Sequence, residues 1–421
     1  MVSCLTSVDE GVGDAERIDQ IRLLEELKAA AGAAQAKVTA KFVASQHAAQ
    51  VDAGLAPERI GKGVASQVGL AKRESPCRAR RYVGWCQILT TELPCTFRAL
   101  QEGRINEWRA MIVARETGWL SLPHRTSIDE EISGALESWG DRQVEAEVKK
   151  RAYRLDPHGF LDRIRTAESE RRVTLRPAPD TMSVLAGVLP VAQGVSVFAS
   201  LQRHADSLRA AGDERSRGQI MADTLVERVT GRAIADAVPV EVGLVMTDQT
   251  LFNLGTGSHE PAHVQDFGPV PAELARRLAA RAAEAAELWV RRLYADPRSR
   301  DLVGMDSRRR CFDGALAGFL VVRDAICRTP WCNAPIRHKD HVMRVGDGGI
   351  TSADNGQGLC EACNLAKEAP GWRARSGGGG GSGSWVDTVT PTGHTYRSRP
   401  PDPPGKTATP EPAGVPRATV A

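Results

Sequence analysis

The chain has 421 residues, of which 42% are hydrophobic and 25% are charged. This is a globular composition, which excludes wholesale disorder and, at roughly 100–200 residues per domain, allows two or three domains. The formal net charge is +3, from 55 basic and 52 acidic residues. Any attraction to nucleic acid must therefore come from a local cluster of charge rather than from the chain as a whole.

The cysteines and the apolar segments indicate the compartment. Nine cysteines are spread unevenly along the chain, and an odd, scattered set is a poor disulfide framework. The N-terminus has no basic start followed by an apolar run, and the longest uncharged stretch, 181–202, is too polar to span a bilayer. We therefore expect a cytoplasmic protein with reduced thiols and no membrane contact.

Apolar periodicity and breaker residues predict mainly helices. In chain order, helices are predicted at about 15–50, 58–72, 76–92, 104–119, 126–138 and 141–154. Short strands at 173–176 and 182–185 then surround a turn, and they are followed by helices at 191–211 and 216–230, a buried strand at 238–246 and a helix at 272–293.

Composition divides the chain into four parts, which together predict an α+β protein. Residues 1–15 are expected to be disordered, and residues 16–297 to form a mainly helical domain with a few strands. Residues 298–372 form a compact, Arg-rich module with five of the nine cysteines. Residues 373–421 combine a Gly/Ser linker, one hairpin over 385–396 and a Pro-rich tail, which we expect to be disordered.

Two cysteine pairs in the module have the spacing of a structural zinc site. Cys327 and Cys332 form the first pair and Cys360 and Cys363 the second, with 27 residues between the pairs. Each pair can occupy a tight turn, and four thiolates give closed tetrahedral coordination of Zn²⁺. Four unrelated buried cysteines are the alternative, but a segment this short needs a metal to stabilise it.

The residues between and after the pairs predict a second, catalytic site. With Asp340 and His341 at the end of a strand and Asn364 on the helix that follows Cys363, a carboxylate and an amide oxygen can share a hard divalent cation such as Mg²⁺. Because side chains alternate along a strand, His341 would point away from Asp340. An imidazole suits the deprotonation of water near neutral pH.

This arrangement, CRTPWCNAPIRHKDHVMRVGDGGITSADNGQGLCEACNLAK over 327–367, resembles the HNH endonuclease motif of the ββα-metal nuclease fold. The resemblance implies that His341 is the general base and that Asn355 holds its imidazole in orientation. It also implies that Asp340 and Asn364 bind the catalytic Mg²⁺ or another divalent metal, which stabilises the phosphate and the leaving 3′ oxygen. The four cysteines would hold the structural zinc.

The chain as a whole is similar to a large actinobacterial family that joins a helical domain of unknown function to an HNH module. The segments that carry this similarity are LPCTFRALQEGRI at 93–105, DSRRR at 306–310, RDAICRTP at 323–330 and TPTGHTY at 390–396. Members of that family often have His at the positions of Asp340 and Cys363, and both replacements here keep a residue that can bind a metal. The resemblance also fits an association with a mobile element or with host defence.

Basic residues around the motif predict contacts with the DNA backbone. The candidates are Arg308, Arg309, Arg310, Arg328, Arg337, Lys339 and Lys367. A solvated charged face is the alternative interpretation of this cluster. The sequence thus predicts a metal-dependent DNA endonuclease, for which a homodimer would ease a double-strand cut. A zinc-stabilised DNA-binding protein with a silent nuclease site is the second hypothesis.

Overall fold

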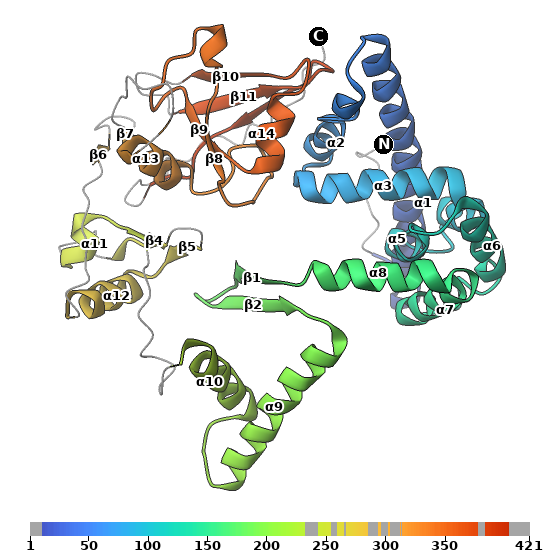
Figure 1. The fold of residues 1–421 in the computed structure, drawn as a ribbon, viewed down its shortest axis with the longest axis horizontal. Coiled ribbons are helices and arrows are strands. Elements are labelled where there is room, and N and C mark those ends of the chain that lie inside the picture. The colour runs from blue at the N-terminus through green and yellow to red at the C-terminus, as the bar shows by residue number, and fades with distance from the viewer. Residues whose placement is uncertain are drawn as a thin grey trace.

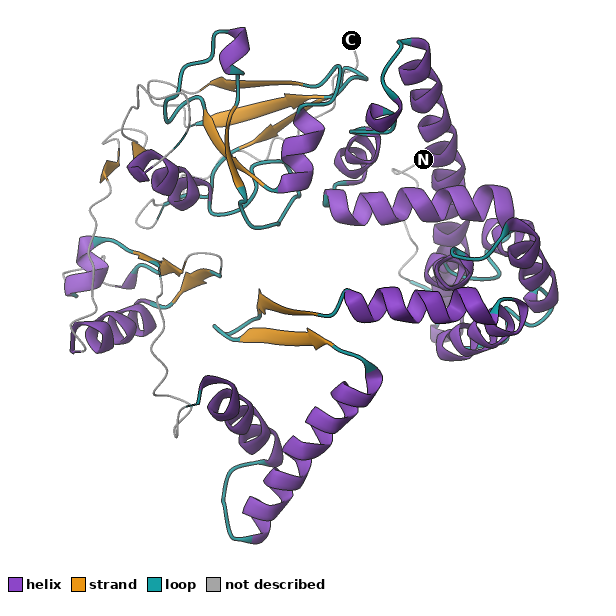
Figure 2. Ribbon diagram, viewed as in Figure 1, coloured by secondary structure: helices purple, strands orange, loops and turns teal. Residues whose placement is uncertain are grey.

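The computed structural model describes residues 11–231, 243–253, 259–264, 267–284, 294–295, 302–303, 312, 314–377 and 384–403. Its N-terminal part is helical, as predicted, and strands gather in the middle and C-terminal parts (Figures 1 and 2). The N-terminal helices are α1 (Asp14–Asp52), α2 (Val64–Lys72), α3 (Pro76–Glu92), α4 (Pro94–Gln101), α5 (Glu107–Thr117), α6 (Leu122–Ile132), α7 (Asp141–Leu155) and α8 (Pro157–Ser169).

Proline starts several of these helices, which explains two that the sequence did not predict. Pro94 and Pro157 occupy the first turns of α4 and α8, where a helix tolerates proline because its first N–H groups have no intrahelical partner. The Asp156 side chain also caps α8 by accepting a hydrogen bond from the Gly159 N–H at 2.8 Å. Interpreting Pro94 only as a breaker between helices was therefore wrong.

A single apolar core joins α1 with α3 to α7. Its largest fully buried side chains include Leu93, Leu100, Ile128, Ile132 and Val144. A buried carboxylate, Asp129, accepts hydrogen bonds from the Cys95 and Thr96 N–H groups at 2.7 and 2.9 Å. It thereby satisfies free donors at the start of α4 from a neighbouring helix.

The middle part consists of a hairpin, a helix pair and short strands. The predicted hairpin pairs β1 (Arg172–Pro177) with β2 (Ser183–Val188) in antiparallel register, and α9 (Val191–Ala210) and α10 (Arg217–Thr230) follow. The further elements are β3 (Leu244–Val245), α11 (Asp248–Phe252), β4 (Ala262–Val264), β5 (Gly268–Val270), α12 (Ala272–Glu284), β6 (Tyr294–Ala295) and β7 (Leu302–Val303). The buried strand predicted at 238–246 lies partly outside the described residues, and its described part is half-buried.

The C-terminal part is rich in strands. Helix α13 (Gly314–Asp324) precedes the antiparallel pair β8 (His338–His341) and β9 (Gly356–Leu359), with the short turn η5 (Val345–Asp347) between the strands and α14 (Glu361–Lys367) after them. The predicted hairpin is present as β11 (Trp385–Val389) and β12 (Thr395–Ser398), and β10 (Arg373–Gly377) adds a third strand beside β11. The predicted disordered tail falls largely on residues outside the description.

An ion-pair cluster explains the third strand. Asp387 on the central strand β11 is 1% exposed and lies between Arg397 on β12, at 2.7 Å, and Arg375 on β10, at 3.2 Å. The hydrogen bonds from Arg397 contribute most to lowering the pKa of this carboxyl. Because Arg375 belongs to a segment that reads as part of a flexible linker, this contact was hidden in the sequence.

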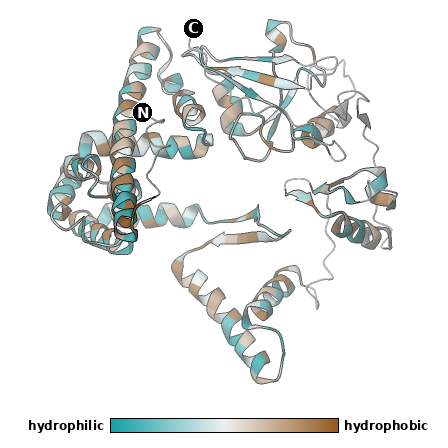
Figure 3. Ribbon diagram, turned by 180° about the vertical axis from the view of Figure 1, so that it is seen from behind, coloured by the Kyte–Doolittle hydropathy of each residue, from teal (hydrophilic) through white to brown (hydrophobic). Residues whose placement is uncertain are grey.

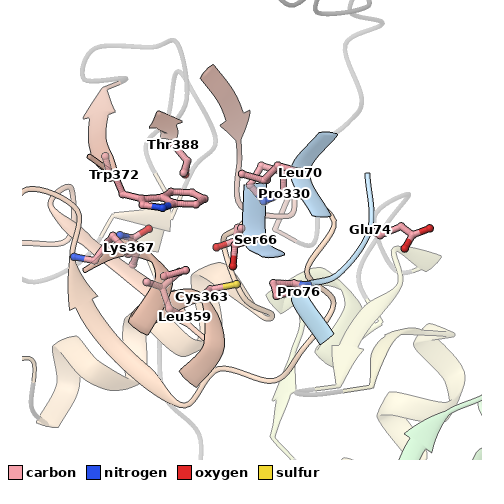
Figure 4. A pocket seen from close by; sticks show the side chains of 14 residues that line it. Ser66, Leu70, Glu74, Pro76, Pro330, Leu359, Cys363, Lys367, Trp372 and Thr388 are labelled. Atoms are coloured by element: carbon pink, nitrogen blue, oxygen red, sulfur yellow. The ribbon is translucent and has the colours of Figure 1, made fainter. Parts of the chain in front are cut away.

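The start of the helical part packs against the C-terminal module. Leu70 of α2 forms one buried cluster with Ala369 and Trp372, and the Thr392 hydroxyl donates to Gln67 Oε1 at 3.1 Å. Gly63 has φ +80°, and a Cβ there would lie 2.6 Å from Trp372 Nε1. Figure 4 shows the pocket at this contact, with Leu70 facing Trp372.

None of the described helices combines the length and the apolar character that crossing a bilayer would require.

Candidate metal and catalytic site

The four predicted zinc ligands come together. Cys327, Cys332, Cys360 and Cys363 are all buried, and their sulfur atoms lie within 4.8 Å of one another, with Cys332 and Cys360 3.6 Å apart. Tetrahedral ligands about 2.3 Å from zinc place their sulfur atoms about 3.8 Å from one another. The group therefore has the chemistry and the spacing of a structural zinc site.

Local backbone structure aims these thiols at one point. The Cys327 N–H donates to Ala334 O and the Cys332 N–H to Thr329 O, both at 3.0 Å, so the first pair sits on a tight turn. Cys360 caps α14, and its sulfur accepts the Cys363 N–H at 3.4 Å. Hydrogen bonds among the thiols lower the pKa of Cys360 and raise that of Cys363, with Cys327 the largest contributor to both shifts. A cation would replace the shared protons, because thiolates are the metal-binding form.

Asp340 faces α14, while the next residue points elsewhere, as strand alternation predicts. Its carboxylate lies 2.6 Å from Lys367 Nζ, and the same ammonium donates to the His341 carbonyl oxygen at 2.9 Å. Lys367 is 9% exposed and also pairs with Glu368 at 3.0 Å. The structure thus places Lys367, predicted to contact DNA, inside the module beside the predicted metal ligand.

Two oxygen atoms on facing elements could share a cation. Asn364 Oδ1 on α14 is buried without a hydrogen-bond donor, whereas Asp340 Oδ2 on β8 has the Lys367 ammonium as its partner at 2.6 Å. Asn364 lies one helical turn before Lys367, on the face that meets β8. Leaving a buried amide oxygen unsatisfied costs free energy, which a bound hard cation would recover. The predicted catalytic metal ligands fit such an ion.

His341 is buried and held at one nitrogen. Its Nε2 atom lies 2.9 Å from the Thr351 hydroxyl, and its ring packs on Phe312 with the ring centroids 4.6 Å apart. Burial is the largest cause that lowers the pKa of His341, opposed by the nearby Asp340 carboxylate. A lowered pKa favours the neutral imidazole, which is the form that can accept a proton.

Asn355 contacts the backbone beside His341 rather than its imidazole. The side-chain NH₂ donates to the carbonyl oxygens of Met343 at 3.0 Å and Ile350 at 2.8 Å, and Oδ1 accepts the Met343 N–H at 2.8 Å. Both amide hydrogens are used, so the orientation of the His341 ring comes from Thr351. Asn355 instead closes the loop 342–350, in which a Cβ at Gly349 would overlap the Met343 carbonyl oxygen.

Thr351 is a site residue that could not be predicted from the sequence alone. If it orients His341, Thr351→Val should lower the rate of the reaction at His341 about tenfold, which corresponds to a loss of about 1.4 kcal/mol. Thr351→Ser keeps the hydroxyl and should retain most of the rate. Equal rates for Thr351→Val and the parent would show that Thr351 does not orient His341.

A buried ionic cluster holds the strand that follows Asn355. Asp324 is fully buried, binds Arg323 through two hydrogen bonds at 2.7 and 3.0 Å, and accepts from Arg328 at 2.9 Å and from the Gly358 N–H at 2.7 Å. Arg323 also donates to the Ala353 and Gly356 carbonyl oxygens at 2.6 and 2.8 Å. The cluster therefore ties α13 to both sides of the Asn355 position.

Removing the negative charge from this cluster should destabilise the module strongly. Asp324→Asn leaves two buried guanidinium groups without their anion, and breaking a buried pair in this way costs about 3–5 kcal/mol. We expect a lower urea concentration at the midpoint of metal release, while Asp347→Asn on the exposed turn η5 should leave that midpoint unchanged. An unchanged midpoint for Asp324→Asn would contradict a stabilising role.

The predicted DNA-contacting residues divide into three groups. Arg337 and Lys339 are exposed. Arg328 is 4% exposed and bound to Asp324, so it is turned inward like Lys367. Arg308, Arg309 and Arg310 lie outside the described residues.

Comparison with known proteins identifies a family over the chain from α1 to the end of α13. Residues 21–324 match the family described as a domain of unknown function (DUF222). The match ends before Cys327, so it includes neither the cysteine cluster nor the Asp340–His341 site. Comparison with curated proteins found no match, and comparison with solved structures found none either.

Proposed function

The chain belongs to the DUF222 family, and we propose that its C-terminal module is a metal-dependent HNH endonuclease that hydrolyses phosphodiester bonds in DNA. The observation that carries the proposal is the buried oxygen without a donor, Asn364 Oδ1, on the helix that contacts β8, where the Asp340 carboxylate stands next to a buried histidine. A purely structural helix would have no use for such an atom, since it is costly to bury without a partner.

The residues then take separate roles. His341 removes a proton from the attacking water; in the tautomer whose Nε2–H donates to the Thr351 hydroxyl, Nδ1 is the accepting nitrogen. Asp340 and Asn364 would hold the divalent cation. When bound, that cation supplies positive charge for the phosphate and for the departing 3′ oxygen. Asn355 keeps the loop after His341 closed.

Lys367 links β8 to α14 at the proposed site. Its ammonium reaches the Asp340 carboxylate and the His341 carbonyl oxygen at once, so it fixes both adjacent residues of β8 relative to α14. The positive charge of Lys367 also compensates the negative charge of the Asp340 carboxylate inside the module. We therefore assign Lys367 a positioning role in place of a direct contact with DNA.

The DNA backbone would meet the exposed cations of the module. Arg337 and Lys339 flank His338 at the start of β8, and neither side chain has an ion-pair partner among the described residues. Arg308, Arg309 and Arg310 extend this charge in the sequence. Because phosphate contacts release counterions, binding should weaken steeply as salt concentration rises.

A silent DNA-binding protein is the alternative, because the cysteine cluster alone is compatible with a zinc module that only binds. The test is the relaxation of supercoiled plasmid by the zinc-loaded protein with Mg²⁺, Mn²⁺, Ni²⁺ or EDTA. Nicking with a divalent metal and none with EDTA supports the nuclease. Salt-sensitive DNA binding without nicking by any metal would favour the silent protein.

A further inference from the structure

The turn between α2 and α3 concentrates positive charge at the surface. Residues 72–81, KRESPCRARR, contain five basic residues and one acidic residue, a local net charge of +4, whereas the whole chain carries +3. The basic residues, called here the α2–α3 cation cluster, are Lys72, Arg73, Arg78, Arg80 and Arg81. All of them except Lys72 are exposed. Charge of one sign at this density attracts an anionic partner.

The α2–α3 cation cluster is not neutralised by carboxylates of the part of the chain that the structure describes. None of its members forms an ion pair there, and Lys72 instead donates to Gln35 Oε1 at 2.6 Å and lies 3.8 Å from the centre of the Tyr82 ring. On α5 to α8, by contrast, most lysines and arginines are paired with carboxylates: Arg109, Arg115, Arg125, Lys149, Lys150, Arg151, Arg163 and Arg165. The cluster therefore keeps its charge for an anion that comes from outside.

This cluster lies beside the C-terminal module. The guanidinium carbon of Arg73 is 6.0 Å from the centre of the Trp331 ring, which stands between the first two cysteines of the module. Glu74 and Pro330 line the same pocket. Helix α14 contacts both α3 and β8 and lies between them in Figure 1, and the end of α3 next to the module is largely hydrophilic in Figure 3. One helix therefore separates the cluster from the strand of the proposed catalytic residues.

The module itself offers few cations to a DNA backbone. Of the basic residues predicted to contact DNA and described by the structure, Arg337 and Lys339 are exposed, whereas Arg328 and Lys367 are turned inward onto carboxylates. Proteins that hold duplex DNA neutralise several phosphates, for example about 6–10. A neighbouring surface that supplies further unpaired cations would complete such a binding site.

Resting on the proposed nuclease function, we propose that the α2–α3 cation cluster binds the phosphate backbone of the duplex that the module cleaves. Four of its five members are arginines, whose planar guanidinium groups match phosphate oxygens in pairs. One turn of duplex is about 34 Å long, so DNA seated on the module would extend beyond a single helix about 10 Å across. Backbone contacts carry no sequence information, so the cluster raises the affinity for duplexes of any sequence.

The test is the affinity of the zinc-loaded protein for a fluorescent duplex, measured by anisotropy without added divalent metal, so that no cleavage is needed. The variant Arg78→Ala/Arg80→Ala/Arg81→Ala should raise the dissociation constant about 100-fold at 0.1 M salt. It should also lower the slope of log affinity against log salt concentration by about 2–3, close to one for each lost phosphate contact. Alanine favours helix, so the unfolding temperature should be retained.

Two further variants separate charge in this place from charge in general. Arg98→Ala/Arg142→Ala/Arg154→Ala removes the same net charge from exposed arginines on α4 and α7 that have no ion-pair partner among the described residues, and it should bind DNA like the parent. Arg78→Lys/Arg80→Lys/Arg81→Lys keeps the charge of the α2–α3 cation cluster and should retain most of the salt dependence.

Competition with polyglutamate distinguishes DNA from an acidic protein, and polyglutamate at an equal concentration of charge should displace little of the duplex. A parent that does not bind DNA, parent-like affinity of the triple alanine variant, an equal loss in the α4 and α7 control, or displacement by polyglutamate as effective as by unlabelled duplex would each overturn the proposal. Nicking by the parent together with unchanged affinity of the triple variant would refute this inference alone. Cluster-dependent binding without nicking by any metal would refute the nuclease alone.

Discussion

Replacing His341 by Ala should lower the rate of DNA cleavage by about 10²–10⁴-fold, the contribution of a positioned general base. DNA affinity should change little, because His341 is 9% exposed and its ring contacts Phe312 and Thr351 inside the module. The oxygens proposed to bind the catalytic metal and the cysteine cluster lie on other side chains, so the zinc content should also be retained. The measurements are the nicking rate under single-turnover conditions and the zinc content of the same sample.

The control for this substitution is His338→Ala. His338 begins the same strand three residues earlier, but it is exposed. The His338→Ala variant should therefore cleave DNA at close to the parent rate. Parent-like cleavage by His341→Ala would show that the base is another group, even if the protein proved to be a nuclease.

Replacing Cys360 by Ser should unfold the module, which is the largest stability effect we expect. Structural zinc sites contribute about 10–16 kcal/mol of apparent binding free energy at pH 7, and Cys360 is both a proposed zinc ligand and the cap of α14. Losing that helix would also displace Asn364 and Lys367. Zinc content should fall well below one per chain, and limited proteolysis should cut within 314–377.

Cys77→Ser is the matched control, because Cys77 is exposed on α3 and outside the cluster. It should keep both zinc and protease resistance. A Cys360→Ser variant that retained one tightly bound zinc per chain would contradict the four-cysteine site. Chelation of the parent should reproduce the Cys360→Ser result, since the metal and not the thiol chemistry stabilises the fold.

The sequence predicted the fold class and most elements, because local signals were strong where they existed. The capping box of Ser216 and Gln219 starts α10, and Gly231 ends it with φ +69°, as the sequence indicated. The prediction over 58–72 was wrong in its first half, where Gly61 and Gly63 adopt positive φ and delay α2 until Val64. Two glycines so close together interrupt a helix that its apolar pattern would otherwise allow.

The cysteine cluster could be predicted because its spacing is itself the signal, whereas the contacts around the catalytic residues depend on tertiary structure. The Thr351–His341 contact, the position of Phe312 under the imidazole and the Asp324 cluster join residues from separate elements. For the same reason a basic side chain such as Arg328 read as a surface cation, although Asp324 binds it in the interior. The local sequence pattern does not show whether an ion pair is buried.

The helical part has a clear structural relation to the module even though its family has no described function. Its α2 helix contributes Leu70 and Gln67 to the contact with Trp372 and Thr392, so the two parts are held together by apolar packing and a hydrogen bond. The helical part therefore fixes where the module sits, and the exposed hairpin extends from that same part.

The most direct test of the proposed site is the nicking of supercoiled plasmid by the zinc-loaded parent and by Asp340→Ala, across a range of Mn²⁺ concentrations. Asp340 supplies the proposed carboxylate ligand, and its replacement by Ala removes that ligand while leaving the four cysteines in place. The account predicts Mn²⁺-dependent nicking by the parent, with Asp340→Ala at least about 100-fold slower at every Mn²⁺ concentration, a loss of about 2.7 kcal/mol. Equal nicking by the two proteins, or none by the parent, would contradict it.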